Sequence, residues 1–95
     1  MNEMENCQKN RYHILFYGQV QGVGFRYRAY HAATALGLTG WVKNLWDESV
    51  EMEIQGDTEA IMRMVHQIEK SEYIGIRDVK WKKIPLESDS GFHIR

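Results

Sequence analysis

The stretch Tyr12–Leu36 changes from a strand pattern to a helix pattern across a glycine-rich turn. Within Tyr12–Tyr17 every residue except His13 is apolar or aromatic, which is typical of a central strand. After the turn the apolar residues follow helical spacing, and Gly37 can end the helix. These residues are Phe25, Ala29, Ala32, Ala33 and Leu36. The chain therefore opens with a strand, a turn and a helix, the first half of a βαβ crossover.

A hairpin of two short strands is expected next, over residues 38–44 and 49–56. In the second strand Val50, Met52 and Ile54 alternate with polar residues, so one face of the predicted sheet is buried and the other faces solvent. A second strand–helix pattern follows the hairpin.

Asp57 or Thr58 can cap this second helix. Its apolar stripe is Ile61, Met64, Val65 and Ile68. Strands over residues 75–84 and 91–95 complete the order β-α-β-β-α-β plus a short C-terminal strand. This order predicts an α+β, ferredoxin-like sandwich with both helices on one face of a mostly antiparallel sheet. We expect Trp81 and the second helix's stripe to lie in its core.

Composition limits the classes of protein that this chain can belong to. It has 95 residues, one cysteine (Cys7) and a formal net charge of −1. We expect residues 1–10, which are polar, to form a disordered leader, and residues 11–95 to form one domain. The near-neutral charge argues against nucleic acid or an anionic membrane as a partner. No apolar run approaches the length of a membrane span. We expect a monomer in the reducing cytoplasm.

The glycine-rich turn lies where a helix N-terminus can bind an anion. Gly18, Gly22 and Gly24 let the chain curl so that successive N–H groups point inward. Arg26, in the first helical turn, adds a fork of donors that fits phosphate oxygens. The residues alone leave two interpretations open: a phosphate-binding loop, or a plain tight turn with Arg26 in a surface ion pair.

Three sequence runs resemble the acylphosphatase family: GQVQGVGFR (residues 18–26), GWVKN (residues 40–44) and VEMEIQG (residues 50–56). The family's hallmarks are a Gly-x-Val-Gln-Gly-Val-x-Phe-Arg run followed by Gly-Trp-Val-x-Asn, and both are met here in the same order and spacing. The resemblance covers the chain from about Arg11 onward. The family's fold is the ferredoxin-like sandwich that the order of elements predicts.

The resemblance implies a site and a reaction. Arg26 would bind the substrate phosphate, and Asn44 would position the attacking water. The phosphate would be surrounded by the backbone of Gln19, Val20, Gln21, Gly22, Val23, Gly24 and Phe25. The implied reaction hydrolyses a small-molecule acyl phosphate to a carboxylate and inorganic phosphate, with no metal and no cofactor. The four histidines show no metal-ligand spacing, in agreement with this.

Some alternatives remain. Asn44 precedes a hairpin and could be a turn residue only. The side chain of Gln21 could serve only to brace the loop, and Arg28 reads as a solvated helix residue. The family usually has a glycine in the hairpin, whereas this chain has Trp46–Ser49, so Asp47 or a longer loop must shape the turn.

Two other functions use the same fold. One is a non-catalytic binding module, for example for RNA, which would need exposed aromatics and a basic surface. The other is a carbamoyl-phosphate-handling domain at the start of a larger maturation protein, which a chain of 95 residues makes less favoured.

Overall fold

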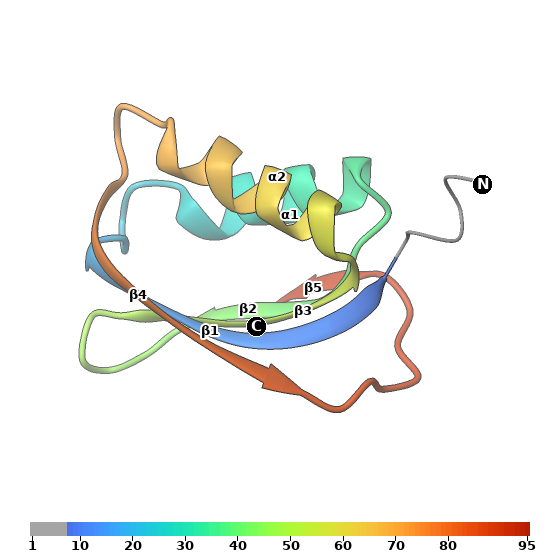
Figure 1. The fold of residues 1–95 in the computed structure, drawn as a ribbon. Helices are drawn as coiled ribbons and strands as arrows, with labels where there is room; N and C mark the ends of the chain where they lie inside the picture. The colour runs from blue at the N-terminus through green and yellow to red at the C-terminus, as the bar shows by residue number, and fades with distance from the viewer. Residues whose placement is uncertain (1–7) are drawn as a thin grey trace.

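A computed structural model describes residues 8–95 as a five-stranded sheet with two helices on one face (Figure 1). The elements are β1 (Lys9–Gln19), α1 (Phe25–Ala35), β2 (Thr39–Asn44), β3 (Val50–Asp57), α2 (Thr58–Glu69), β4 (Gly75–Ile84) and β5 (Phe92–Ile94). The predicted order of strands and helices is confirmed, including the short last strand.

The strands lie in the order β4-β1-β3-β2-β5. All neighbouring pairs are antiparallel except β2 with β5, which is parallel. This is the predicted ferredoxin-like α+β fold. Because β1 and β2 both run antiparallel to β3, they point the same way, and their last residues, Gln19 and Asn44, lie at one end of the sheet. The topology thereby brings two distant sequence motifs together.

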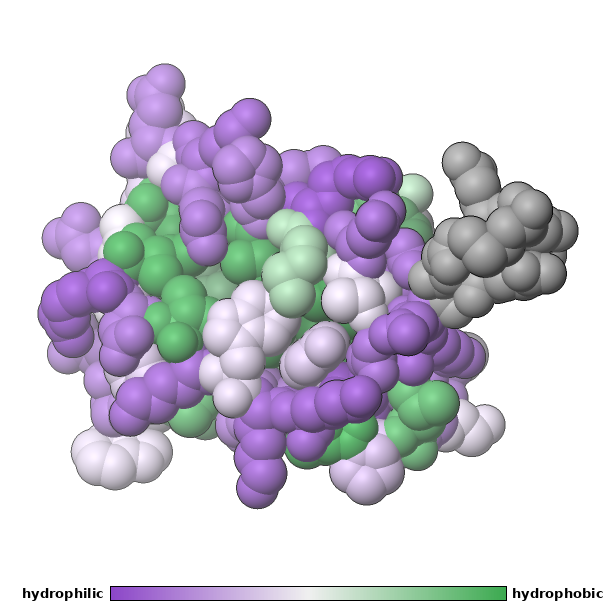
Figure 2. All heavy atoms as spheres, in the orientation of Figure 1, coloured by the Kyte–Doolittle hydropathy of each residue, from purple (hydrophilic) through white to green (hydrophobic). Residues whose placement is uncertain are grey.

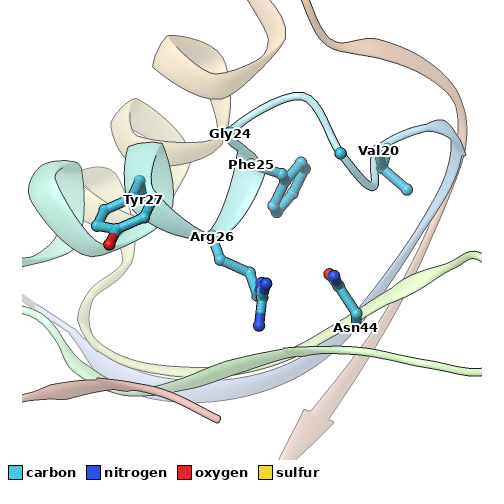
Figure 3. Close-up of a pocket in the computed structure, with 7 residues that line it drawn as sticks. Val20, Gly24, Phe25, Arg26, Tyr27 and Asn44 are labelled. Carbon is cyan, nitrogen blue, oxygen red and sulfur yellow. The ribbon is translucent and has the colours of Figure 1, made fainter.

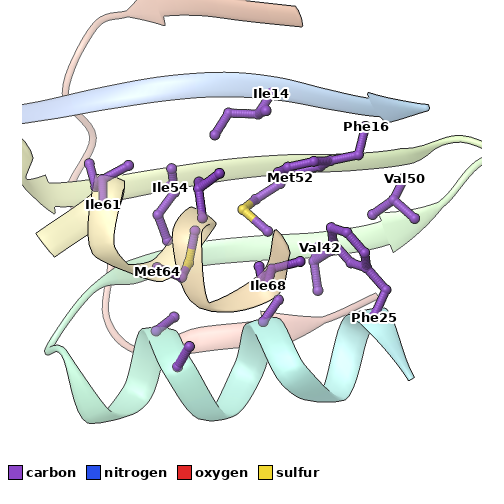
Figure 4. Close-up of a cluster of buried hydrophobic side chains, with 14 of the residues drawn as sticks. Ile14, Phe16, Phe25, Val42, Val50, Met52, Ile54, Ile61, Met64 and Ile68 are labelled. Atoms are coloured by element: carbon purple, nitrogen blue, oxygen red, sulfur yellow. The ribbon is translucent and has the colours of Figure 1, made fainter. Parts of the chain in front are cut away.

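The core lies between the sheet and the helices (Figure 4). Val50, Met52 and Ile54 of β3 are fully buried, as their alternation predicts. The predicted stripe of α2 is buried as well, and α1 contributes Phe25 and three alanines to the core. Asp57 caps α2 by accepting a hydrogen bond from the backbone N–H of Ala60 at 3.4 Å.

Trp81 was predicted in the core, and this prediction is wrong. Its side chain is 37% exposed and packs edge-on against Tyr12, with ring centroids 5.5 Å apart. The reason is that β4 is an edge strand, and the helices pack mainly over β2, β3 and β5. Figure 2 shows hydrophobic residues in the band between the helix layer and the sheet, on the side where β4 forms the edge.

The first strand also begins earlier than the sequence predicts. Lys9 and Asn10, placed in the leader above, pair with Asp57 and Gly56 as the first residues of β1. The Asn10 side chain donates a 2.6 Å hydrogen bond to the Thr58 hydroxyl. Residues 1–7 of the predicted leader lie outside the described residues. No helix within residues 8–95 is long and apolar enough to cross a bilayer.

The sheet face that points away from the helices carries a buried arginine. Arg11 is only 1% exposed, and its guanidinium donates to Glu53 Oε1 at 2.9 and 3.0 Å. It also donates to Gln55 Oε1 and Asp89 Oδ2, both at 3.3 Å. Since Asp89 belongs to the segment between β4 and β5, Arg11 ties that segment to the sheet.

Candidate active site

The loop between β1 and α1 presents a helix N-terminus without a side-chain cap. Gly24 is the N-cap residue, with φ 81° and ψ 17°, and it accepts the first helical hydrogen bond from the N–H of Arg28 at 3.0 Å. The left-handed φ is the reason that a glycine stands here. The first N–H groups of α1 have no intrahelical acceptor, and its first turn contains no acidic residue. This helix end therefore favours an anion.

Gly18, which the sequence analysis assigned to the same loop, has a different role. It lies within β1 at a bulge, opposite Ile76 of β4. A Cβ atom built on Gly18 would clash with the backbone of the neighbouring strand, at 2.2 Å from the Gly75 carbonyl oxygen. The glycine permits close strand packing and lies outside the loop.

Arg26 projects from the first turn of α1 toward the end of β2 (Figure 3). Its Nη1 donates to the Arg95 backbone oxygen at 3.3 Å. No Asp or Glu side chain within residues 8–95 forms an ion pair with Arg26. The alternative of a surface ion pair with an Asp or Glu side chain therefore has no partner in the described chain.

Asn44 is the last residue of β2 and pairs with Val50 on the helix-facing side of the sheet. Its Oδ1 atom is buried and accepts no hydrogen bond from a described residue. A buried acceptor left unpaired costs about 1–3 kcal/mol of folding stability. A purely structural role of Asn44 as a turn residue does not explain why the protein bears this cost. Asn44 and Arg26 point into the same hollow from opposite sides (Figure 3).

That hollow has a volume of about 170 Å³ and joins the loop, the helix end and β2. Six of the predicted site residues line it: Val20, Gly22, Gly24, Phe25, Arg26 and Asn44. The seventh lining residue is Tyr27, which sequence reasoning missed although it directly follows Arg26. Gln19, Gln21 and Val23 do not line it.

Gln21 instead braces the loop. Its Nε2 donates to the carbonyl oxygens of Leu45 at 2.7 Å and Ser49 at 2.8 Å. Both acceptors belong to the hairpin that follows Asn44. The side chain therefore holds the loop against the end of β2, which is the bracing role considered above.

The hairpin turn between β2 and β3 is closed without a glycine. Glu48 adopts φ 74°, a conformation that L residues rarely take. Asp47 Oδ1 accepts hydrogen bonds from the Ser49 hydroxyl and backbone N–H. These bonds lower the pKa of Asp47 below its usual value of 3.8. Asp47 shapes the turn as expected. Glu48 occupies the left-handed position, which a glycine would adopt without strain.

The chemistry that this arrangement allows follows from its donors. An uncapped helix N-terminus and one guanidinium can bind a tetrahedral anion, and an amide beside them can orient a neutral molecule. Within residues 8–95, no three His, Cys, Asp or Glu side chains gather where they could hold a metal ion.

Comparison with known proteins connects the site to a family. The family model described as acylphosphatase matches residues 12–94. The acylphosphatase of Clostridium beijerinckii is 38% identical over 87 residues, which cover 90% of this chain and 97% of that protein. The acylphosphatase of Caldanaerobacter subterraneus is 48% identical over 60 residues, or 63% of this chain. With three curated relatives the chain aligns over only 60–67% of their own length.

Solved structures show the same similarity. The structure of an acylphosphatase from Coxiella burnetii has a TM-score of 0.85 and 33% identity, with both chains fully covered. The structure of HypF from T. kodakarensis has a TM-score of 0.78 and 34% identity. It is similar over 93% of this chain but only 12% of its own.

Proposed function

Because this chain belongs to the acylphosphatase family of enzymes, which hydrolyse acyl phosphates, we propose that it cleaves an acyl phosphate through Arg26, Asn44 and the residue 19–25 loop. The observation that carries the proposal is the convergence of three features on one hollow of about 170 Å³. These are the uncapped N-terminus of α1, the Arg26 guanidinium and the unpaired Asn44 amide oxygen.

The substrate phosphate binds at the helix N-terminus in this mechanism. Free N–H groups of the loop and first turn donate hydrogen bonds to its negatively charged oxygens, and Arg26 contributes two parallel donors. Phosphoryl transfer passes through a loose transition state with charge on the equatorial oxygens. Donors fixed in place before the reaction stabilise that charge without reorganising.

Asn44 orients the attacking water. Its Oδ1 can accept a hydrogen bond from water, which gives the buried oxygen a partner. Because the transition state is loose, attack of the water on the phosphoryl group depends on the position of the water more than on its deprotonation. An amide is therefore sufficient where a stronger base is absent from the pocket lining.

The leaving group needs neither an acid nor a metal. It departs as a carboxylate, whose conjugate acid has a pKa of about 4, so it leaves unprotonated at neutral pH. We therefore propose a metal-free reaction. Phosphate monoesters, whose aryloxide or alkoxide leaving groups are more basic than a carboxylate, should be poor substrates for the same site.

The RNA-binding alternative finds little support on the open face of the sheet. Arg95 and Lys43 lie over the ring of Trp41, at 4.6 and 5.6 Å from its centroid. Lys80 lies over Tyr17 at 5.4 Å. Side chains of the chain itself thus lie over these two rings, on which bases would otherwise stack. The monomeric state and the cytoplasmic location stay predictions.

The decisive experiment measures phosphate release from acetyl phosphate, with p-nitrophenyl phosphate as the monoester control. We expect turnover of acetyl phosphate only, unchanged by EDTA.

Arg26→Ala and Arg26→Lys should each lower kcat/KM by about 10³-fold, because a point charge does not replace the guanidinium fork. Arg63→Ala, on the exposed side of α2, is the control. Both Arg26 variants within tenfold of wild type would disprove the assignment of Arg26, and loss of activity in EDTA would disprove the metal-free mechanism.

A further inference from the structure

A second hollow adjoins the proposed phosphate pocket and shares Gly24 and Tyr27 with it. Its volume is about 310 Å³, against about 170 Å³ for the phosphate pocket. Its other lining residues are Val23, Arg28 and His31. The hollow is therefore large enough for an organic group and begins where a phosphate pocket ends.

Four of its lining residues form one stripe at the N-terminal end of α1. Gly24, Tyr27, Arg28 and His31 follow the spacing i, i+3, i+4, i+7, which places them on the same face of the helix. Such a stripe usually carries apolar residues toward a core. Here it is exposed, and it carries a phenol, a guanidinium and an imidazole.

Two aromatic rings of the stripe lie nearly parallel to each other. The rings of Tyr27 and His31 stack with centroids 6.4 Å apart and an interplanar angle of 21°. Arg28 forms no ion pair with any Asp or Glu side chain of residues 8–95. The face thus offers an unneutralised cation beside a flat aromatic surface.

Another hollow also adjoins the phosphate pocket and shares Val23 with the hollow described above, but it suits an anion less well. It shares only Val20 with that pocket, and Glu48 is part of its lining. A carboxylate at that wall repels a negatively charged group, whereas Arg28 attracts one. The linings of these two hollows therefore differ in the sign of their charge.

We propose that the hollow lined by Tyr27, Arg28 and His31 binds the acyl group of the substrate and favours acyl groups with a second anionic group at the far end. Arg28 is the specificity-determining residue, and Tyr27 supplies a surface for the carbon skeleton. This inference rests on the proposed function, because the acyl group reaches the hollow only when the phosphate occupies the neighbouring pocket.

The test compares 4-carboxybenzoyl phosphate with 4-methylbenzoyl phosphate. The two acyl groups have the same rigid ring and differ in whether the far end carries a charge. In the wild type we expect kcat/KM to be about tenfold higher for the carboxylate, equivalent to about 1.4 kcal/mol. In Arg28→Gln the ratio should fall to about one.

Arg63→Gln is the matched control, since it removes the same charge from an exposed position on α2 and should keep the tenfold ratio. Thermal unfolding checks that each variant is folded, and because the readout is a ratio, a general loss of activity cancels. A wild-type ratio near one, or a ratio unchanged in Arg28→Gln, would overturn the acyl-site proposal while the hydrolysis itself stands. If neither aroyl phosphate nor acetyl phosphate is hydrolysed, the proposed function fails and this inference fails with it.

Discussion

The side-chain amide of Gln21 donates a 2.7 Å hydrogen bond to the backbone carbonyl oxygen of Leu45. Leu45 directly follows Asn44, so this bond joins the proposed phosphate loop to the strand end that carries the proposed water-binding residue. The same nitrogen donates to the Ser49 carbonyl at 2.8 Å, across the hairpin turn. One side chain therefore fixes the distance between the two halves of the site.

Gln21→Met should lower both stability and kcat. Methionine has a similar length but no donor, so two hydrogen bonds worth about 0.5–1.5 kcal/mol each are lost. We expect the melting temperature to fall by on the order of 10 °C, and kcat to fall because the loop is no longer held against Asn44. Thermal unfolding and steady-state kinetics measure the two effects. Gln67→Met, on the exposed face of α2, is the control; a Gln21 variant that behaves like it would show that the brace has no role.

Asn44→Ala should separate catalysis from stability. We expect kcat to fall by about 10²–10³-fold, as for the loss of one catalytic hydrogen-bonding group. The inhibition constant of inorganic phosphate should change little, because the water is not part of phosphate binding. The melting temperature should change little, since the variant removes no hydrogen bond between this oxygen and a described residue. If phosphate inhibition weakened as much as kcat fell, Asn44 would be a binding residue instead.

Glu48→Gly should stabilise the hairpin. Glu48 has φ 74°, where an L side chain costs about 1–2 kcal/mol and glycine does not. The greater freedom of glycine in the unfolded chain offsets part of this gain, which leaves a net stabilisation of about 0.5–1 kcal/mol. Glu48→Ala is the control, because it removes the same charge and keeps the strain. Equal melting temperatures for the two variants would show that the left-handed residue is not strained.

Periodicity was sufficient to predict the helices and most of the sheet. The stripe of α2 and the alternation in β3 depend on residues close in sequence, so their pattern is visible without the structure. Trp81 alternates just as regularly, but alternation does not show that β4 lies at the edge, where the helices leave it half open. The position of a strand within the sheet depends on contacts between distant residues, which a local pattern does not contain.

The same limit applies to single polar residues. Arg11 reads as an ordinary charge at a strand start, yet its partners Glu53 and Asp89 lie 42 and 78 residues away. Arg26 was predicted from its place in the first helical turn and from the family motif, whereas Asn44 was predicted from the motif alone. The parallel direction of β1 and β2 explains why the two residues lie at the same end of the sheet. The family motif gives Tyr27 no role, and only the lining of the pocket in the structure shows that it belongs to the site.

Inorganic phosphate should raise the melting temperature of the wild type and have little specific effect on Arg26→Ala. The pocket exists only in the folded chain, so phosphate binds the native state and stabilises it by mass action. At ten times its dissociation constant the stabilisation, RT ln 11, is about 1.4 kcal/mol. For a domain of this size that corresponds to roughly 6–10 °C.

Phosphate and sulfate also stabilise proteins generally, and Arg26→Ala keeps that general effect while it loses the specific one. Differential scanning fluorimetry over a phosphate titration measures both. Equal shifts in the two proteins would mean that Arg26 does not hold phosphate, and the proposed site would have to be abandoned.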